Sequence, residues 1–347
     1  MLKRWARRQA YCSASTAGEE TSSFASQEAL SSEGPGRFVA GPSDTCSGAD
    51  RARVWDPAGV TDWTRQRFRH ALAVFRRGSN PAAIVYDSIG TDFFLAMAPG
   101  WLNLGLWEGS GSEEEAPVAV RRLVQVIAKE LPEDGVILDV GNGLGVQDPV
   151  IAEVARPRQF MAMNITESQL RAGREPMAEA GAAPILGDAT RIPLADSSVD
   201  GVISVEAAFH FPSRRRFFAE AFRVLRPGGV LTMSDVPIAR RLRGFRELLA
   251  GFSQLRLWGL PMNAAATPTE IENACRSAGF TNVTTELVGN RVFPQALRVA
   301  RRRLAQGAGS SGSIRLAARL FLSQAELLWK RRAIEYSLLR AQRPAQG

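Results

Sequence analysis

The sequence predicts an α/β protein with a doubly wound, mostly parallel sheet and helices on both faces of that sheet. One observation is the short apolar run Val136–Val140, which is typical of a strand buried on both faces and leads into a glycine-rich turn at 141–145. The other is that strand-like and helix-like segments alternate after this turn at the spacing of βαβ units. Open α/β sheets bind ligands at the carboxyl ends of their strands, so we expect a ligand at this turn.

Four further strands are expected after this one, each short, apolar and bounded by turn-forming residues. They cover residues 160–166, 183–189, 199–205 and 230–235. Thr166 and Gln169 have the spacing of a capping box at the start of the helix after the second strand. The helix Pro212–Leu225 is expected to end at the Arg-Pro-Gly-Gly segment 226–229.

Apolar residues at helical spacing predict two helices before the first strand, at 62–77 and 120–131. Beyond the fifth strand we expect helices at 245–260, 267–279 and 316–329, and strands at 281–288 and 334–339. The helix at 267–279 begins with a capping box, Thr267 with Glu270. The stretch Pro294–Arg332 is longer than such a sheet needs, and its arginines alternate with apolar residues. We expect it to cover a pocket or to lie on a membrane surface.

Length and composition restrict the class of protein. The 347 residues and the 45% hydrophobic content allow one large domain with a substantial core. Cys12, Cys46 and Cys275 are far apart, so they form no metal-binding pattern and indicate a reducing compartment. With two histidines in the chain, a histidine-rich site is excluded, and we expect no metal. No apolar run approaches the length of a membrane span.

The net charge of +8 is concentrated in the amino-terminal segment, in 62–77 and after Arg298. Such a charge fits nucleic acid, an anionic membrane or an acidic substrate. We favour solvated arginines and no nucleic-acid partner, because no aromatic residues are interleaved with the basic ones. Contact of the basic carboxyl-terminal helices with a membrane stays open, as does the oligomeric state.

The glycine-rich turn narrows the identity of the ligand. A dinucleotide-binding loop has the pattern G-x-G-x-x-G, but Val146 stands where its third glycine belongs. Asp139, Gly141, Gly143 and Gly145 form the pattern D-x-G-x-G-x-G instead. This pattern resembles the first motif of class I S-adenosylmethionine-dependent methyltransferases.

Further motifs carry the same resemblance through most of the chain. Gly187-Asp188-Ala189 with 192–200 resembles the family's G-D-A segment, and 222–229 resembles its R-V-L-K-P-G-G segment. The run Asn164–Gln169 resembles that of the subgroup that methylates quinones, sterols, tocopherols and natural-product alcohols. Tyr86-Asp87 and 104–108 resemble the amino-terminal lid of that subgroup. The resemblance implies a Rossmann-like, seven-stranded sheet with a helical lid and an antiparallel last strand.

The resemblance also implies a cofactor, S-adenosylmethionine, and residues that hold it. The three glycines admit the cofactor to the backbone, and Asp139 is expected at the ammonium of its methionine half or in hydrogen bonds to the glycine loop. Asn164 replaces the acid that most class I enzymes place at the ribose hydroxyls, and it is paired in this subgroup with Gln169. Asp188 and Ala189 are expected at the adenine, and Tyr86 and Trp107 in the wall of the site.

Three residues are candidates for catalysis. His210 follows the fourth strand and is the candidate general base, because an imidazole titrates near neutrality. Asp235, at the end of the fifth strand, is placed to orient His210, to bind a substrate hydroxyl or to cap a helix. Glu206 is expected at the methionine portion of the cofactor, or as a buried, hydrogen-bonded acid of the kind seen in lipid cyclopropane synthases.

The expected organisation is a disordered or targeting extension at 1–57 followed by one methyltransferase domain at 58–345. Within that domain, a lid covers 58–116, a cofactor-binding core 117–236, and acceptor-side helices and closing strands 237–345. The first residues are rich in Arg and Ser and lack acids, so organellar import is an alternative to a cytoplasmic location.

The sequence therefore predicts an enzyme that transfers a methyl group to an oxygen, or a carbon, of a small lipophilic acceptor. One alternative is a non-catalytic methyltransferase-like protein that binds the cofactor or assists assembly. A nicotinamide-dependent oxidoreductase is the other, and the glycine pattern and Asn164 disfavour it.

Overall fold

The computed structural model describes residues 96–257, 260, 264–306 and 312–345. The expected extension at 1–57, the helix at 62–77 and Tyr86 lie outside the described residues, as does most of the expected lid. The boundaries that we drew between lid, core and acceptor side therefore stay predictions.

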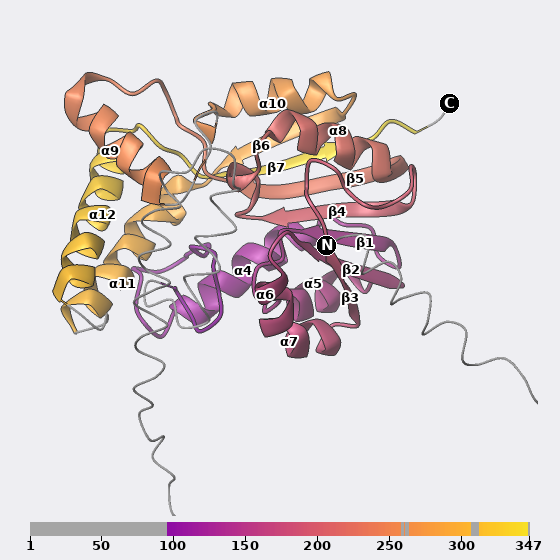
Figure 1. Ribbon diagram of the computed structural model, residues 1–347, viewed down its shortest axis with the longest axis horizontal. Coiled ribbons are helices and arrows are strands. Elements are labelled where there is room, and N and C mark those ends of the chain that lie inside the picture. Colours follow the sequence, from indigo (N-terminus) through magenta and orange to yellow (C-terminus); the bar gives the residue numbers. More distant parts are fainter. Residues whose placement is uncertain (1–95, 258–259, 261–263, 307–311, 346–347) are drawn as a thin grey trace, which may run out of the picture. The chain divides into compact units, whose positions relative to one another are not determined.

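A seven-stranded, mostly parallel sheet forms the centre of the described part of the chain (Figure 1). Its order is β3-β2-β1-β4-β5-β7-β6, in which β7 runs antiparallel to both of its neighbours. The strands are β1 (Val136–Val140), β2 (Gln159–Asn164), β3 (Ala182–Leu186), β4 (Val199–Val205), β5 (Leu225–Asp235), β6 (Thr281–Leu287) and β7 (Ser337–Gln342). The predicted fold class and antiparallel last strand are confirmed.

Helices cover both faces of this sheet, because its central strands, such as β1 and β4, are buried on both sides. The first layer comprises α4 (Ala116–Ala128), α5 (Asp148–Ala155), α6 (Glu167–Ala172) and α7 (Arg174–Glu179). The second layer comprises α8 (Arg214–Val224) and α10 (Pro268–Ser277), where Phe217, Phe218 and Cys275 are fully buried. In Figure 1 the two layers lie below and above the sheet.

Three more helices form a separate group beyond the carboxyl ends of β4 and β5, on the left of Figure 1. They are α9 (Gly244–Leu257), α11 (Phe293–Ala305) and α12 (Gly312–Lys330). The long stretch Pro294–Arg332 thus folds as two amphipathic helices, and α11 buries Val299 and Leu304 in one cluster with α4. None of the helices in the described ranges combines the length and the apolar character needed to cross a bilayer.

Some local expectations were wrong in informative ways. Strand β5 begins at Leu225, which pairs with Val199 of β4, and includes the Arg-Pro-Gly-Gly segment. That segment falls in the irregularity before Val230 pairs with Gly201, and its glycines form backbone hydrogen bonds with Arg343. Strand β7 runs from Ser337 to Gln342, three residues later than predicted. Thr166 occupies the N-cap of α6 but its side chain makes no capping hydrogen bond. The capping box of α10 is formed as predicted.

Candidate active site

The glycine loop after β1 adopts a backbone that only glycine accepts without strain. Gly141, Gly143 and Gly145 have φ of +85°, +59° and +73°. A Cβ added at Gly141 would lie 2.5 Å from the Cβ of Ala207, and one added at Gly143 would lie 3.1 Å from Leu102 Cδ1. The glycines therefore keep open a narrow space between this loop and the segments opposite it.

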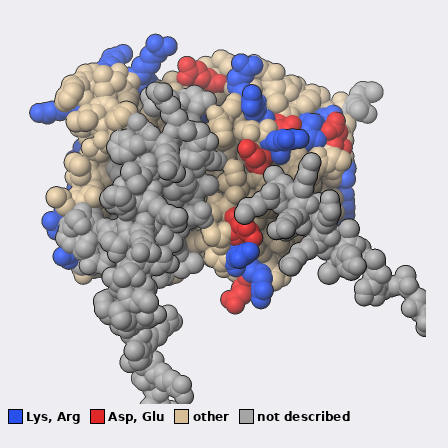
Figure 2. Space-filling view, in the orientation of Figure 1, with Lys and Arg blue, Asp and Glu red and all other residues tan. Residues whose placement is uncertain are grey.

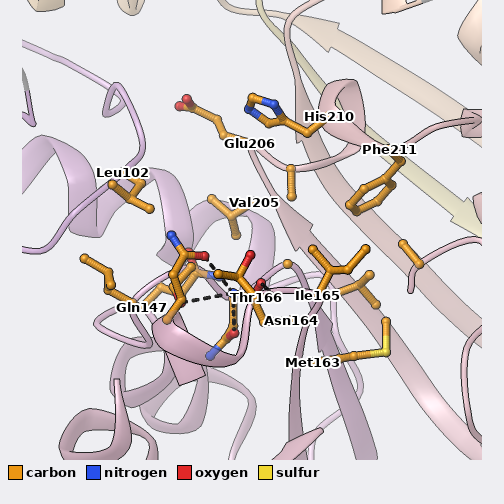
Figure 3. Close-up of a pocket in the computed structure, with 18 of the residues that line it drawn as sticks. Leu102, Gln147, Met163, Asn164, Ile165, Thr166, Val205, Glu206, His210 and Phe211 are labelled. Carbon is orange, nitrogen blue, oxygen red and sulfur yellow. Dashed lines mark hydrogen bonds between the residues drawn. The ribbon is translucent and has the colours of Figure 1, made fainter. Parts of the chain in front are cut away.

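That space is a pocket of about 90 Å³ at the carboxyl ends of β1 to β4 (Figure 3). Of the residues predicted to hold a cofactor, Gly141, Gly143, Asn164, Gln169, Asp188 and Ala189 line the pocket. Gly145 and Asp139 do not line it, and Tyr86 is outside the described residues. The pocket lies beside β1 and β4, the neighbouring strands at which the strand order changes direction. Doubly wound sheets bind their ligands at this switch point.

Asn164 ties the loop after β2 to the glycine loop. Its Nδ2 donates to Gln169 Oε1 at 3.0 Å and to the carbonyl of Gly143 at 3.1 Å. Its Oδ1 accepts the N–H of Thr166 at 3.0 Å. An acid could not make the first two bonds, so the amide at this position fits its surroundings. The pairing of Gln169 with Asn164 also explains why Gln169 forms no capping box.

Asp139 lies one layer behind the pocket and reaches it through a neighbour. The residue is fully buried, and Gln147 Nε2, whose residue lines the pocket, donates to Asp139 Oδ2. Burial raises the pKa of Asp139 to about 7. Burial, followed by the charge of Asp139, also raises the pKa of its neighbour Asp148. Burial therefore disfavours the ionised form of both carboxyl groups.

Asp188 and Ala189 lie at the opposite end of the pocket, after β3. The N–H and the hydroxyl of Thr190 both donate to Asp188 Oδ1 at 2.8 Å. These bonds fix the orientation of the carboxylate at the pocket wall. Ala189 is almost fully buried, so its backbone forms part of the floor.

A second, larger cavity of about 230 Å³ adjoins the first. Most of its lining is apolar, and a large part of it comes from α9, α11 and α12, including Leu255, Ala300, Phe321, Leu322, Ala325 and Leu328. Four residues line both cavities: Leu102, Asn103, Glu206 and His210. The two cavities therefore meet at an acid and an imidazole (Figure 3).

Glu206 is held rigidly at this junction. It follows β4 with a φ of +48°, and its Oε1 accepts hydrogen bonds from the N–H of Leu104 and the hydroxyl of Tyr336, both at 2.6 Å. Burial raises the pKa of Glu206 to about 7, against the lowering effect of these two bonds. Glu206 is thus a hydrogen-bonded acid, which agrees with the second of the two roles that we inferred for it from the sequence.

His210 ends the short helix η1 (Ala208–His210) and is 8% exposed. Burial, and secondarily the positive charge of Arg214, lower the pKa of His210 to about 3. The expectation that this imidazole titrates near neutrality was therefore wrong. The side chain is therefore neutral throughout the physiological range. A pKa this low also makes the imidazole a weak base, so it takes up a proton only when another change of charge in the site favours the imidazolium.

Asp235 is engaged by an arginine that sequence reasoning missed. Arg214 Nε and Nη2 donate to the two carboxylate oxygens of Asp235 at 2.7 and 2.9 Å, and Nη1 donates to the carbonyl of Ala264 at 2.8 Å. Both members of this pair are buried. Asp235 therefore anchors the start of α8, and the charge of Arg214 acts on His210.

Several other placements could not be anticipated. Trp107, expected in the wall of the site, is 1% exposed in a hydrophobic cluster, and its Nε1 donates to the carbonyl of Leu104 at 2.8 Å. Leu102, Asn103 and Gln147 line the pocket from loops whose sequences carry no motif. Only the three-dimensional path of those loops brings them to the site.

Comparison with known proteins agrees with this geometry. Residues 138–233 match the family model described as a methyltransferase domain. The erythromycin 3''-O-methyltransferase of Saccharopolyspora erythraea is 30% identical over 258 residues, which cover 72% of this chain and 82% of that protein. An O-methyltransferase of Penicillium expansum is 26% identical over 265 residues, covering 75% of this chain and 91% of the relative.

Solved structures share the fold at lower identity. A cyclopropane synthase from Mycobacterium tuberculosis has a TM-score of 0.63 at 19% identity, covering 74% of this chain and 95% of that one. Phosphoethanolamine N-methyltransferase 2 of Haemonchus contortus, solved with S-adenosyl-L-methionine, has a TM-score of 0.57 at 17% identity and covers 77% and 58% of the two chains.

The chain belongs to the family of class I S-adenosylmethionine-dependent methyltransferases. It is an enzyme that uses S-adenosylmethionine and methylates small molecules. The alternative of a non-catalytic family member is not favoured by these relatives.

Proposed function

We propose that the enzyme methylates a hydroxyl oxygen of a lipophilic small molecule bound in the second cavity. The observation that carries the proposal is the meeting of the two cavities at Glu206 and His210. A cofactor in the first cavity and an acceptor in the second would approach each other at these side chains. The relatives named as O-methyltransferases support oxygen as the acceptor atom.

The lining of the second cavity supports a lipophilic acceptor. Its walls from α9, α11 and α12 are mostly aliphatic, and three of its four polar lining residues, Asn103, Glu206 and His210, also line the first cavity. Such a cavity holds an apolar body by burial and orients it by the few polar groups at one end. A hydroxyl of the acceptor would therefore be directed toward Glu206 and His210.

The first cavity fits S-adenosylmethionine in its chemistry. Asn164 and Gln169 supply hydrogen-bonding groups after β2, where the ribose would lie, and Asp188 and Ala189 supply an acceptor and a backbone surface for the adenine. Gln147, backed by Asp139, stands beside the glycine loop, where the methionine half would lie. A side chain at Gly143 would fill this cradle.

The reaction is an in-line displacement in which the cofactor supplies an electrophilic methyl group on a sulfonium. A ring nitrogen of neutral His210 would take the hydroxyl proton as the oxygen–carbon bond forms and the carbon–sulfur bond breaks. The sulfonium would lose its positive charge in the same step, which favours a positive charge on this weakly basic imidazole. The buried position of His210 and the two hydrogen bonds of Glu206 hold these groups in place at the junction. Glu206 positions the acceptor hydroxyl or the sulfonium end of the cofactor.

We also propose that the enzyme works in a reducing compartment such as the cytoplasm. Cys275 is a free, fully buried thiol on α10, and burial raises the pKa of that thiol to about 12. A thiol kept protonated in this way is unreactive and fits a cytosolic protein.

Methyl transfer with isotope-labelled S-adenosylmethionine tests the proposal. The protein is incubated with a panel of lipophilic alcohols, matched ketones that lack the hydroxyl, and an extract of the source organism, and products are fragmented in a mass spectrometer. We expect label in a methoxy group of one class of alcohol and none from the matched ketones. Label on carbon would overturn the assignment of oxygen as acceptor.

A further inference from the structure

An outward-facing apolar surface on α9 and α12 has no role in the site described above. We propose that this surface docks the enzyme on an anionic lipid bilayer. The α9–α12 face, as we call it, consists of Phe245, Leu248, Leu249, Leu316 and Leu320, which are 79%, 55%, 49%, 68% and 59% exposed. Isolated exposed leucines are ordinary, whereas five large apolar side chains on two adjacent helices are not.

The spacing of these residues gives α9 an apolar stripe on its outer side. Phe245, Leu248 and Leu249 follow one another at i, i+3 and i+4, so they share one side of the helix. Glu247 and Ala250 are buried, and Gly251 lines the second cavity. The inner face is thus already occupied by the protein, and the outer stripe is additional to what the fold requires.

The charge around the face favours an anionic surface. Arg241, Arg243, Arg246 and Arg319 are exposed on the same two helices and the turn before α9. The acids of these helices are already paired, Glu247 with Arg240 at 2.8 Å and Glu326 with Arg301 and Lys330. Figure 2 shows mainly uncharged surface along the left border of the molecule, with Lys and Arg at its edge.

Apolar side chains flanked by arginines are the composition of helices that lie in the interface of a membrane. The apolar groups enter the acyl boundary, and each arginine near the surface gains from the negative potential of the lipids. A protein partner would need acids placed opposite each arginine, whereas an anionic bilayer offers charge over the whole face. We therefore commit to the bilayer as the occupant.

The face lies directly behind the second cavity. Gln254 Nε2 donates to the carbonyl of Phe321 at 3.1 Å and Gln324 Nε2 to Ser253 Oγ at 3.3 Å, so α9 and α12 pack side by side. Their inner sides contribute Leu255 and Leu322 to the cavity lining. If the proposed function holds, a lipophilic acceptor dissolved in the bilayer would need to pass only between these helices. The docking itself does not depend on that function.

Vesicle co-sedimentation of the full chain tests the docking. One set of vesicles is phosphatidylcholine and the other phosphatidylcholine mixed with phosphatidylglycerol. We expect binding to the anionic vesicles that weakens as salt is added. The double variant Phe245→Ser, Leu249→Ser should weaken this binding by about tenfold or more. Leu287→Ser is the matched control, because Leu287 is 52% exposed on β6, away from the face.

A second pair of variants tests the charge. Arg243→Gln with Arg246→Gln should lower binding to anionic vesicles by about tenfold or more, while Arg216→Gln on α8 leaves it unchanged. Equal losses in the test and control variants would overturn the proposal, as would no binding to either vesicle. Self-association that Phe245→Ser, Leu249→Ser abolishes would also overturn it, in favour of a second copy as occupant. Cofactor affinity should be the same in every variant, which separates this test from that of the proposed function.

Discussion

The two titratable residues at the junction of the cavities have pKa values that move in opposite directions for the same reason. Burial disfavours the charged form, so it raises the pKa of Glu206 and lowers that of His210. At neutral pH the imidazole is uncharged and the carboxyl group is close to half ionised. A neutral base beside a cationic cofactor avoids the repulsion that an imidazolium would cause.

The first prediction concerns His210. His210→Ala should lower turnover of a hydroxyl acceptor by about a hundredfold or more, because a positioned general base contributes on that order. Affinity for S-adenosylhomocysteine, measured by calorimetric titration, should change by less than about twofold. Since the pKa of His210 is about 3, the wild-type rate should show no inflection from this imidazole between about pH 5 and about pH 8.

Near-normal turnover of His210→Ala would exclude this base. The site would then act by positioning an oxygen or carbon that is already nucleophilic. An inflection near neutrality that Glu206→Gln removes would assign the titration to Glu206 instead.

The second prediction concerns the stability linked to Glu206. Its pKa rises from 4.5 to about 7 on folding, so the contribution is present below 4.5 and is lost as pH rises through 7. Glu206→Gln keeps an oxygen that can accept from Leu104 N and Tyr336 Oη but cannot ionise. The Tm of the variant minus that of the wild type should therefore increase between about pH 5 and about pH 8. A difference that stays constant or falls would show that Glu206 is not buried in this way.

At the scale of elements, our proposal assigns the choice of acceptor to α9, α11 and α12, which line the second cavity. Removing the stretch Pro294–Arg332 would expose the cluster that α11 shares with α4, including Ala116 and Val120, so a deletion would test folding more than specificity. A substitution on α12 that fills part of the second cavity tests specificity without exposing this cluster.

The third prediction uses such a substitution. Ala325→Phe should raise the KM for the acceptor or lower its turnover by about tenfold or more, because the larger ring takes space from the body of the acceptor. Ala305→Phe, at an exposed position of α11, is the control and should behave as wild type. Calorimetry should give equal affinity for S-adenosylhomocysteine in all three proteins. A loss of cofactor affinity in Ala325→Phe would show that the second cavity is not separate from the cofactor site.

The elements that sequence predicted well are those whose signal is local. Apolar runs located β1 and β4, the latter to the residue, and Thr267 with Glu270 located the start of α10. The start of β5 was missed because Pro227, Gly228 and Gly229 carry no strand propensity. They lie in an irregular stretch between Leu225, which pairs with Val199 of β4, and Val230, and the two glycines form backbone hydrogen bonds with Arg343.

At the scale of the whole molecule, the position of the first pocket was predictable because strand order brings the ends of β1 to β4 to one edge. The second cavity was not predictable, since it depends on how α9, α11 and α12 pack. Arg214 illustrates the difference: its contact with Asp235 joins residues 21 positions apart in sequence, on α8 and β5, and no motif marks it. Its effect on the pKa of His210 follows from packing alone.

The central claim is that the glycine loop and the ends of β1 to β4 bind the cofactor, and calorimetric titration with S-adenosylhomocysteine tests it most directly. The variants are Gly143→Val, and Gly181→Val as control. Both glycines have positive φ, but a Cβ at Gly181 meets nothing within 4 Å, whereas one at Gly143 meets the facing pocket wall at 3.1 Å. We predict that Gly143→Val binds at least about tenfold more weakly than the wild type, a loss of about 1.4 kcal/mol or more, while Gly181→Val keeps wild-type affinity. A folded Gly143→Val protein with wild-type affinity would contradict the account.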